Sequence, residues 1–407
     1  VQAVLAGERL GGNPAWKLAL APRIEEALSV VGPGDSSERA RLLAYLVTAV
    51  EGFDRRSAAA EEAITVARRV GDPRVLCHAL ICACFGLAAP STLEDRRAWS
   101  AEALELAIGN GDLANQMPAH HNTALVHIEE GDFEGADASF AQVRAVAARL
   151  SMPDSDLVVM TNAAWRSLAA GELADAERFI TEGRERAERI DLPGALILTG
   201  ALELALRRYQ GRVAEVVDFL NDVADATPGA NRLNLNIARA FMYSELGDLD
   251  TTRRLFDEIW AEGVEALPWD QSWLSTLDML AVLATVLQAG PAAEQIYGLL
   301  APWSGRVIVF GNGAGVVDHY LGALATSLGR YEDAEQHLTR ALATHDRLAA
   351  PYWSGQTRLA LAQLARVRPD PDLGAAAALA RATFDVAAAR GYATLERRAR
   401  DLLDALA

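Results

Sequence analysis

Apolar residues recur at helical spacing along most of the chain, and short polar turns interrupt the pattern at nearly even intervals. In the segment 120–130, Ala124 and Ile128 lie on one side of a predicted helix, which Gly131 ends. A second helix is expected from about Glu134 to Leu150. The pattern therefore predicts a repeated helical hairpin, in which a first helix, a glycine-containing turn and a second helix follow one another.

The turn consists of a glycine, a polar residue and then an apolar or aromatic residue. It is clearest at Gly131-Asp132-Phe133, Gly171-Glu172-Leu173, Gly211-Arg212-Val213, Gly247-Asp248-Leu249 and Gly329-Arg330-Tyr331. Glycine suits the end of a helix because it adopts positive φ without the clash of a Cβ atom. The successive spacings are 40, 40, 36 and 82 residues, and 82 is about two periods. This regularity indicates an array of one small unit.

Weaker copies of the turn complete the array. We expect turns near Gly52, at Pro90-Ser91, at Gly290-Pro291-Ala292 and at Pro369-Asp370-Pro371. The array then has about nine hairpins of ~40 residues, preceded by a helix from about Trp16 to Val30 and ending with a helix from Ala393 to Ala407. We therefore predict one continuous all-α solenoid over residues 1–407, with N-terminal helices in 1–50, repeats in 51–365 and a C-terminal capping hairpin in 366–407.

Two further positions recur in the second helices. A small residue lies five positions after the glycine, as at Ala136, Ala176 and Ala334, and a large apolar residue lies four positions later, as at Phe140, Ile180 and Leu338. Glycine, aromatic residue, alanine and large apolar residue at this spacing resemble the tetratricopeptide repeat. The resemblance implies a right-handed superhelix whose first helices line a concave groove. The period of ~40 residues is longer than the usual ~34 residues of that repeat.

Composition supports helices and argues against one class of partner. Alanine and leucine are abundant and aromatic residues make up only 6% of the chain, which favours helix over strand. The formal net charge is −17, whereas a protein that binds the backbone of DNA or RNA needs clusters of lysine and arginine. We therefore expect no direct nucleic-acid binding.

The chain carries no targeting signal that the sequence reveals. Its start, Val1-Gln2-Ala3-Val4, lacks the charged region and the apolar run of a signal peptide, and no membrane span is expected. The missing initiator methionine suggests a part of a longer protein. Cys77, Cys82 and Cys84 lie within eight residues of one another on one predicted helix, which is typical of small core residues in a reducing compartment. We expect a cytoplasmic protein.

Three groups of residues raise the question of metal binding or catalysis. His78 and Cys82 are four residues apart on a helix, but structural zinc uses paired ligand clusters and the sequence has no second cluster. The stretch Arg306 to Gly315 combines a β-like run with glycines, which can expose N–H groups to phosphates; it lacks the Gly-Lys-Ser/Thr of a P-loop, and a buried loop between repeats is favoured. His120, His121 and His127 have no nucleophile at catalytic spacing. We predict no catalytic residue, cofactor or metal.

Aromatic and polar residues of the first helices supply the candidate binding residues. Trp165, Trp269, Trp273, Trp303 and Trp353 are expected mainly to pack in the core, with contact to a ligand as the alternative. From their positions on first helices, six residues are predicted to face the concave groove: His121, Trp165, Arg208, Asn234, Phe241 and His319. The expected occupant of the groove is a protein, a peptide or a small-molecule inducer.

The C-terminal third carries a second resemblance. It contains, in order, Leu300-Ala301-Pro302-Trp303-Ser304-Gly305-Arg306, Gly313 to Gly315, Asp318-His319-Tyr320-Leu321-Gly322, Leu328-Gly329-Arg330-Tyr331-Glu332-Asp333-Ala334-Glu335 and Ala350-Pro351-Tyr352-Trp353-Ser354-Gly355-Gln356-Thr357-Arg358. This order resembles the C-terminal repeat region of large bacterial signalling ATPases of the STAND and AAA types, which are linked to a LuxR-type helix-turn-helix or a class III nucleotide cyclase. The resemblance implies the sensor or interaction arm of a regulator. The alternatives are a stand-alone scaffold that binds peptide segments and an enzyme on a helical-repeat fold.

Overall fold

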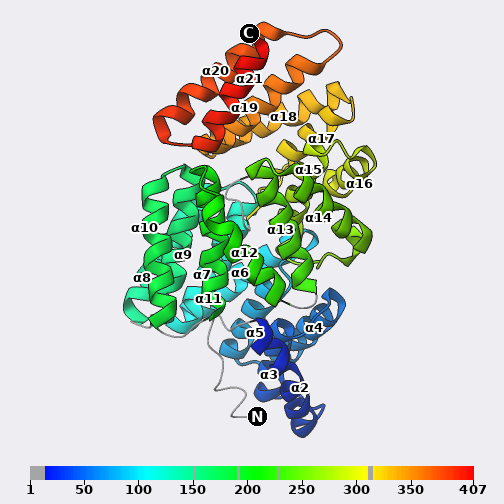
Figure 1. Cartoon of the computed structure of the whole chain (residues 1–407). Helices are drawn as coiled ribbons and strands as arrows, with labels where there is room; N and C mark the ends of the chain where they lie inside the picture. Colours follow the sequence, from blue (N-terminus) through cyan, green and yellow to red (C-terminus); the bar gives the residue numbers. More distant parts are fainter. Residues whose placement is uncertain (1–13, 151–152, 190–192, 228–229, 310–314) are drawn as a thin grey trace. The chain divides into compact units, whose positions relative to one another are not determined.

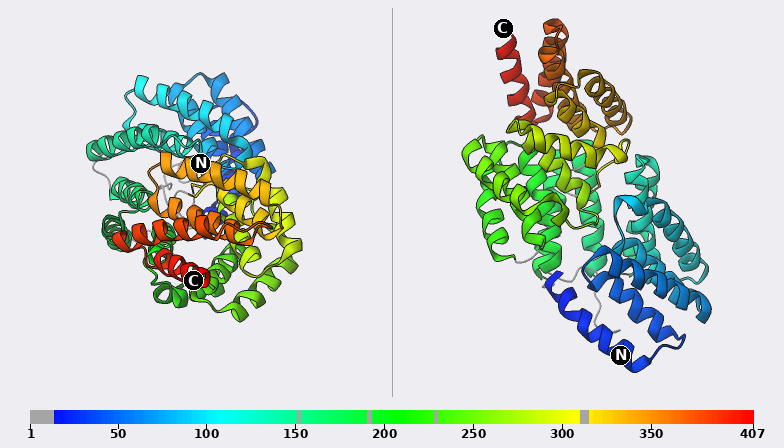
Figure 2. Two further views of the ribbon diagram at one scale, coloured as in Figure 1. Left: turned by 90° about the horizontal axis from the view of Figure 1, so that it is seen from above. Right: turned by 90° about the vertical axis from the view of Figure 1, so that its right-hand side faces the viewer.

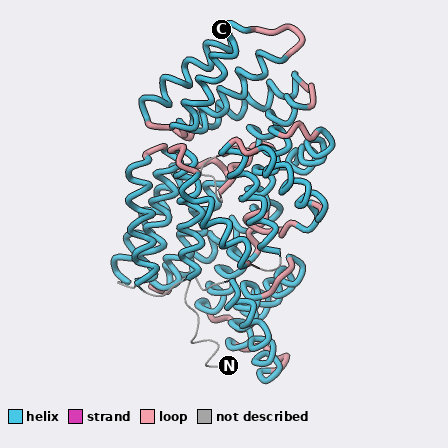
Figure 3. Tube along the Cα trace, viewed as in Figure 1, coloured by secondary structure: helices cyan, strands magenta, loops and turns pink. Residues whose placement is uncertain are grey.

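The structure is a computed structural model, and it describes residues 14–150, 153–189, 193–227, 230–309 and 315–407 (Figure 1). These residues are almost entirely helical (Figure 3). The helices are α2 (Pro14–Val31), α3 (Ser37–Ala49), α4 (Phe53–Val70), α5 (Pro73–Gly86), α6 (Leu93–Gly109), α7 (Leu113–Glu129), α8 (Phe133–Leu150), α9 (Pro153–Ala170), α10 (Leu173–Arg189), α11 (Pro193–Tyr209), α12 (Ala214–Ala226), α13 (Ala230–Leu246), α14 (Leu249–Glu262), α15 (Trp273–Val286), α16 (Gly290–Leu300), α17 (Val317–Ser327), α18 (Tyr331–Arg347), α19 (Pro351–Val367), α20 (Leu373–Arg390) and α21 (Ala393–Leu406). Three short 3-10 helices accompany them: Pro90–Thr92, Val264–Ala266 and Ala301–Trp303.

The helices follow one another as hairpins. In chain order, the described residues form nine pairs from α3/α4 to α19/α20, with α2 before them and α21 after them. Successive first helices contact each other, as α3 does α5, α13 does α15, and α17 does α19. Figure 2 shows the helices α18 to α21 lying against one another at the C-terminal end. The predicted all-α class and the helical-hairpin repeat are confirmed.

The glycine turns form as the sequence predicts. The glycines at 131, 171, 211, 247 and 329 all have positive φ, between 71° and 79°. At the first of them, the Asp132 N–H donates to the His127 carbonyl at 2.8 Å, which closes the end of α7. The polar residue of the turn has a further role in two copies: the Asp132 and Asp248 carboxylates accept hydrogen bonds from the first turn of the following helix.

One predicted turn is misplaced. Gly290 and Pro291 are the first residues of α16, and the left-handed residue of that turn is Gln288, with a φ of 52°. Proline is well accommodated in the first turn of a helix because its missing N–H has no partner there in any case. The Gly-Pro pair therefore marks the start of a helix.

The recurring small and large residues of the second helices belong to the core. Ala136, Ala176 and Ala334 are buried, as are the large residues four positions later. Gly322 on α17 has a related role, because a Cβ atom there would lie 2.5 Å from the Leu338 Cγ atom on α18. The close approach of the two helices explains why a residue without a side chain is needed.

Two further predictions concern the cysteines and the glycine-rich loop. Cys77, Cys82 and Cys84 lie buried and unbridged on α5, as predicted for core cysteines. The β-like run contributes an isolated antiparallel bridge between Val307 and Val316, and both residues are buried. Residues 310–314 of that loop lie outside the described part of the chain.

Backbone contacts divide the molecule into two compact units. Unit 1 holds the described residues up to Ala163 together with those of Phe179–Gly200 and Pro268–Gln271. Unit 2 holds Ala164–Arg178, the described residues of Ala201–Leu267 and those of Ser272–Ala407. The even spacing of the turns contains no sign of this division, and the prediction of one continuous solenoid stays a prediction.

Candidate functional site

Unit 2 contains a cluster of polar and aromatic side chains in its interior. We call it the polar centre and define it by Arg208 and Tyr209 on α11, Phe241 and Glu245 on α13, His319 and Tyr320 on α17, His345 on α18, Tyr352, Trp353 and Thr357 on α19, and Arg398 on α21. All of these residues except Arg398 are buried. Because they come from helices far apart in the sequence, only the stacking of the hairpins brings them together.

A carboxylate shared by two arginines forms the charged part of the polar centre. The Glu245 side chain is 1% exposed and accepts from Arg208 Nε at 2.9 Å and from Arg398 Nη2 at 2.8 Å. Burial by itself would raise the pKa of Glu245, but the Arg398 and Arg208 guanidiniums outweigh burial and hold that pKa below its usual value. Glu245 is therefore ionised at neutral pH.

Aromatic rings surround the Arg208 guanidinium. Its central carbon lies 4.8 Å from the centre of the Phe241 ring and 5.8 Å from that of Trp353, which places the cation against two π faces. The Tyr209 and Tyr352 rings stack beside it with their centres 3.5 Å apart. Arg208 Nη1 is buried and has no hydrogen-bond partner among the described residues. A buried donor of this kind calls for an explanation.

Two neutral histidines complete the polar centre. His319 Nδ1 and His345 Nδ1 lie 3.0 Å and 3.1 Å from the same Thr357 hydroxyl. A hydroxyl has one proton to donate, so one imidazole accepts it and the other donates to the oxygen. Burial lowers the pKa of His319 to about 3 and that of His345 well below its usual value. The polar centre therefore carries its charge on Glu245 and the arginines.

The structure brings three of the six predicted groove residues together. Arg208, Phe241 and His319 all lie in the polar centre. Trp165 is a buried residue of α9. Asn234 lies on α13, where its amide donates to Ser272 Oγ at 3.1 Å. The assignment of these residues to a binding groove stays a prediction.

His121 lies in unit 1, on α7. Its Nδ1 atom is 3.3 Å from the Asn162 side-chain nitrogen. Burial lowers the pKa of His121 to about 4, which makes it a neutral side chain at physiological pH. It therefore belongs to a different part of the molecule from Arg208.

Sequence reasoning missed Glu245, Thr357 and Arg398 as site residues. It predicted Trp353 mainly as a core residue, with ligand contact as the alternative, and Trp353 is buried. One available signal was position: Glu245 lies two residues before Gly247 and Arg208 three before Gly211, where the first helix faces the core. A charged residue at such a position predicts a buried partner of opposite charge.

The Asp318 carboxylate, which follows the glycine-rich loop, has a structural role. It accepts from Ser304 Oγ, from the Gly305 N–H at 2.6 Å, from His337 Nδ1 at 2.7 Å and from Arg340. Burial would raise its pKa, yet these donors lower it to about 2. Asp318 thereby fastens the segment after α16 to α17 and α18.

A shallow depression lies in unit 1, between α6 and α7. It has a volume of about 480 Å³, and its apolar lining includes Leu104, Ile108 and Val126. Ile108 is 56% exposed. An ion pair between Arg97 and Glu130 borders it. This surface is the second candidate for a contact with another molecule.

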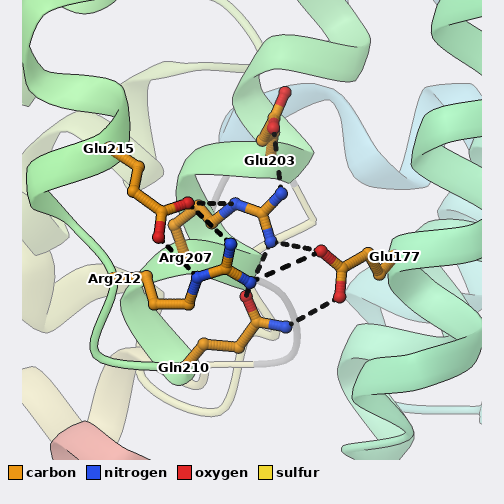
Figure 4. A network of polar contacts seen from close by, with 6 residues as sticks. All are labelled: Glu177, Glu203, Arg207, Gln210, Arg212 and Glu215. Atoms are coloured by element: carbon orange, nitrogen blue, oxygen red, sulfur yellow. Dashed lines mark hydrogen bonds and ion pairs between the residues drawn. The ribbon is translucent and has the colours of Figure 1, made fainter.

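Unit 2 contains a second charged cluster, the outer network, which includes Arg207, the residue before Arg208 on α11 (Figure 4). Arg207 contacts Glu177 on α10 at 2.5 Å and also Glu203 and Glu215, while Arg212 contacts Glu215 at 2.6 Å. Gln210 bridges Arg207 and Glu177. The network joins the second helix of one hairpin to the next hairpin along the chain.

Neither metal ligands nor membrane spans emerge from the described residues. Within that part of the chain, no three His, Cys, Asp or Glu side chains are placed to hold a metal ion. None of the described helices combines the length and the apolar character that crossing a bilayer requires.

Comparison with known proteins leaves the chain without a family. No protein-family model matches it, and no curated protein does. Among solved structures, the chain matches a circular tandem repeat protein with novel repeat topology and enhanced subunit contact surfaces. The alignment has 14% identity, covers 97% of this chain and 89% of the other, and has a TM-score of 0.14. A TM-score this low carries no argument, and the helical-hairpin fold rests on the helices described above.

Proposed function

We propose that the chain is a non-catalytic, ligand- or protein-binding helical-repeat domain that serves as the sensor or interaction arm of a bacterial signalling or transcriptional regulator, and that it binds a ligand in its interior. Its binding interior is the polar centre of unit 2. The observation that carries the proposal is the buried Arg208 guanidinium, which pairs with Glu245 through Nε while Nη1 has no hydrogen-bond partner in the described part of the chain.

The energetics of burial support a binding role for this arginine. An ion pair in the interior is often no more stabilising than well-packed apolar side chains, because both ions lose their hydration. An unpaired N–H in the same place costs a further ~1–3 kcal/mol. A stable repeat core therefore has no need of Arg208, and a ligand that accepts from Nη1 would recover this cost.

The surroundings of Arg208 indicate the class of ligand. A carboxylate or phosphate oxygen is the strongest acceptor for a guanidinium. Trp353 and Phe241 offer apolar ring faces next to the charge, which is the usual composition of a site for a small organic molecule. The proposed ligand is therefore a small organic anion with an apolar body.

Signalling would follow from the repeat architecture. A ligand that contacts several first helices favours the arrangement of hairpins in which those contacts form. The resemblance of the C-terminal third to the repeat regions of bacterial regulators supports a role in which this arrangement controls a neighbouring module.

A thermal-shift experiment tests the proposal. Unfolding of the chain is followed with inorganic phosphate, sugar phosphates and small dicarboxylic acids, each at about 1 mM. A compound at about 100 times its Kd stabilises the folded state by about 2.7 kcal/mol. We expect at least one of these anions to stabilise the wild type and the Arg207→Met variant but not the Arg208→Met variant. Failure of every compound, or equal stabilisation of both variants, would refute the proposal.

A stand-alone scaffold that binds peptides is the second candidate function. The depression between α6 and α7 in unit 1 favours it, because exposed Ile108 and the neighbouring Leu104 offer an apolar strip to the ridge of a helix. Amphipathic helical peptides would bind the wild type and not an Ile108→Asp variant. Equal binding to both proteins would remove this candidate.

A further inference from the structure

The C-terminal helix of unit 2, α21, and Tyr392 just before it contact the ends of three first helices that are distant in the chain. Tyr392 Oη donates to the Gly171 carbonyl at 3.0 Å, and Thr394 Oγ1 donates to the Arg208 carbonyl at 2.5 Å. Arg397 reaches the Glu245 carbonyl at 3.5 Å. These carbonyls lie at the C-terminal ends of α9, α11 and α13. We call the set of contacts the clasp.

The clasp joins parts of the chain that a simple array would leave apart. In a repeat protein, each unit contacts mainly its neighbours. The two ends of the clasp are separated by 221 residues at Tyr392 and Gly171 and by 186 residues at Thr394 and Arg208. Within unit 2, the clasp therefore links α21 and the residue before it to hairpins several repeats earlier.

The contacts across the clasp differ in kind from those between neighbouring helices. Two ion pairs accompany the three hydrogen bonds of the clasp: Arg398–Glu245 and a weaker pair between Arg390 and Glu172 at 3.7 Å. A small apolar contact there is that of Ala393 with Gly211. On the other side of α21, the buried Leu395 packs into the space that Gly355 of α19 leaves open. Water can replace hydrogen bonds and ion pairs with little net loss, whereas separating apolar surfaces is costly. The polar contacts of α21 with the ends of α9, α11 and α13 are therefore easier to separate than its apolar packing on α19.

Two of the turn glycines leave the space that the clasp residues occupy. A Cβ atom at Gly171 would overlap the Tyr392 hydroxyl, and one at Gly211 would lie 3.1 Å from the Ala393 Cβ atom. Gly247 occupies the equivalent turn with nearly the same φ, yet a Cβ atom there would meet nothing within 4 Å. At Gly171 the missing side chain thus serves both the turn and the docking of α21.

We propose that the clasp is a reversible latch of unit 2. In the closed form, Tyr392, Thr394, Arg397 and Arg398 hold α21 against the ends of α9, α11 and α13, and the polar centre is buried. In the open form these polar contacts separate while neighbouring hairpins stay stacked, and the side of Glu245 that Arg398 covers becomes accessible to solvent. The purpose of the latch, which is to admit a ligand to the polar centre, rests on the proposed function. The opening itself does not.

Hydrogen–deuterium exchange of the full chain without ligand tests the latch. The Gly171→Ala variant is compared with Gly247→Ala, because alanine pays the same penalty for positive φ at both turns. Only the first substitution strikes Tyr392, the residue before α21, and it also approaches Pro351 of α19 to 3.1 Å. We expect amides in 391–407 and at the ends of α11 and α13 to exchange about tenfold faster in Gly171→Ala than in Gly247→Ala. Amides of α5, in unit 1, should exchange equally in both variants.

Two results would overturn the latch. One is equal exchange in the two variants at α21, and the other is faster exchange across all of unit 2, which means that the unit unfolds as a whole. If Gly171→Ala does not fold, Tyr392→Phe replaces it, since this change removes only the hydroxyl that bonds to Gly171. Tyr392→Phe must then exchange faster than the wild type at the same amides. If the exchange results support the latch but no anion stabilises the chain, the latch proposal stands and only the proposed ligand is refuted. The two proposals can therefore fail separately.

Discussion

Arg207 and Arg208 are consecutive residues of α11, yet they pair with carboxylates in two different environments, one partly exposed to water and one buried. The side chain of Arg207 is 12% exposed and lies in the outer network among carboxylates that are themselves 19% to 47% exposed (Figure 4). The side chain of Arg208 is 4% exposed, and its carboxylate partner is 1% exposed. A helix turns by about 100° per residue, and this rotation alone separates the two arginines.

The difference teaches where charge matters in this fold. In the outer network the carboxylates keep access to water and Arg207 pairs with three of them, so the loss of one contact is compensated. Arg207, for instance, lowers the pKa of Glu177, and Arg212 stands near the same carboxylate. In the polar centre, Glu245 depends on Arg208 and Arg398, and burial excludes water as a substitute.

The largest expected effect is that of Glu245→Gln. The substitution preserves shape but leaves the buried Arg208 cation without its counter-charge, and breaking a buried pair in this way costs about 3–5 kcal/mol. Urea unfolding monitored by circular dichroism measures the loss. Glu177→Gln in the outer network is the matched control and should lose far less. If the two variants prove equally stable, the polar centre is not the energetic centre of unit 2.

An intermediate effect is expected from acidification. Burial lowers the pKa values of His319 and His345 in the folded state. Below about pH 6.5 these two imidazoles therefore bind protons in the unfolded chain but stay neutral in the folded one. Stability therefore falls as the pH drops from 7 towards 3, by about 2 kcal/mol at pH 5 for His319 alone. Thermal unfolding between pH 5 and pH 7 measures the slope. A His319→Gln and His345→Gln double variant should have a shallower slope, and an unchanged slope would contradict the assignment.

The smallest effect is expected for Arg207→Gln. Pairs with partly exposed carboxylates contribute about 0–1 kcal/mol, and salt screens them. The difference from the wild type should shrink further in about 1 M NaCl, where the Debye length is about 3 Å. The effect of Glu245→Gln should persist at that salt concentration, because its partners are buried. A loss above about 2 kcal/mol for Arg207→Gln would place the outer network on a par with the polar centre.

Much of the fold could be read from local patterns. The turn at Gly131 and the buried Ala136 and Phe140 that follow it are consequences of backbone conformation and helical period, which act over a few residues. The turn before α16 was misplaced because Gly290 and Pro291 suit a helix start as well as a turn. Local chemistry alone does not separate these two uses.

The candidate site was only partly accessible to such reasoning. Arg208, Phe241 and His319 were found because they lie on the first helices, where the core-facing side is predictable. Glu245 and Arg398 were missed because their pairing spans 153 residues and follows no repeat period. The spacing of hairpins says which face of a helix is buried, but not which distant helix lies opposite.

By itself the sequence determined the helical class, the hairpin repeat and most of its turns, because each depends on interactions within some ten residues. Only the tertiary structure decided that Glu245 joins Arg208 to Arg398 and that α21 closes on Gly171. These contacts depend on small rotations between hairpins, which add up over many repeats and leave no periodic trace in the chain. The repeat pattern therefore does not predict the contacts of Glu245, Arg398 and Tyr392.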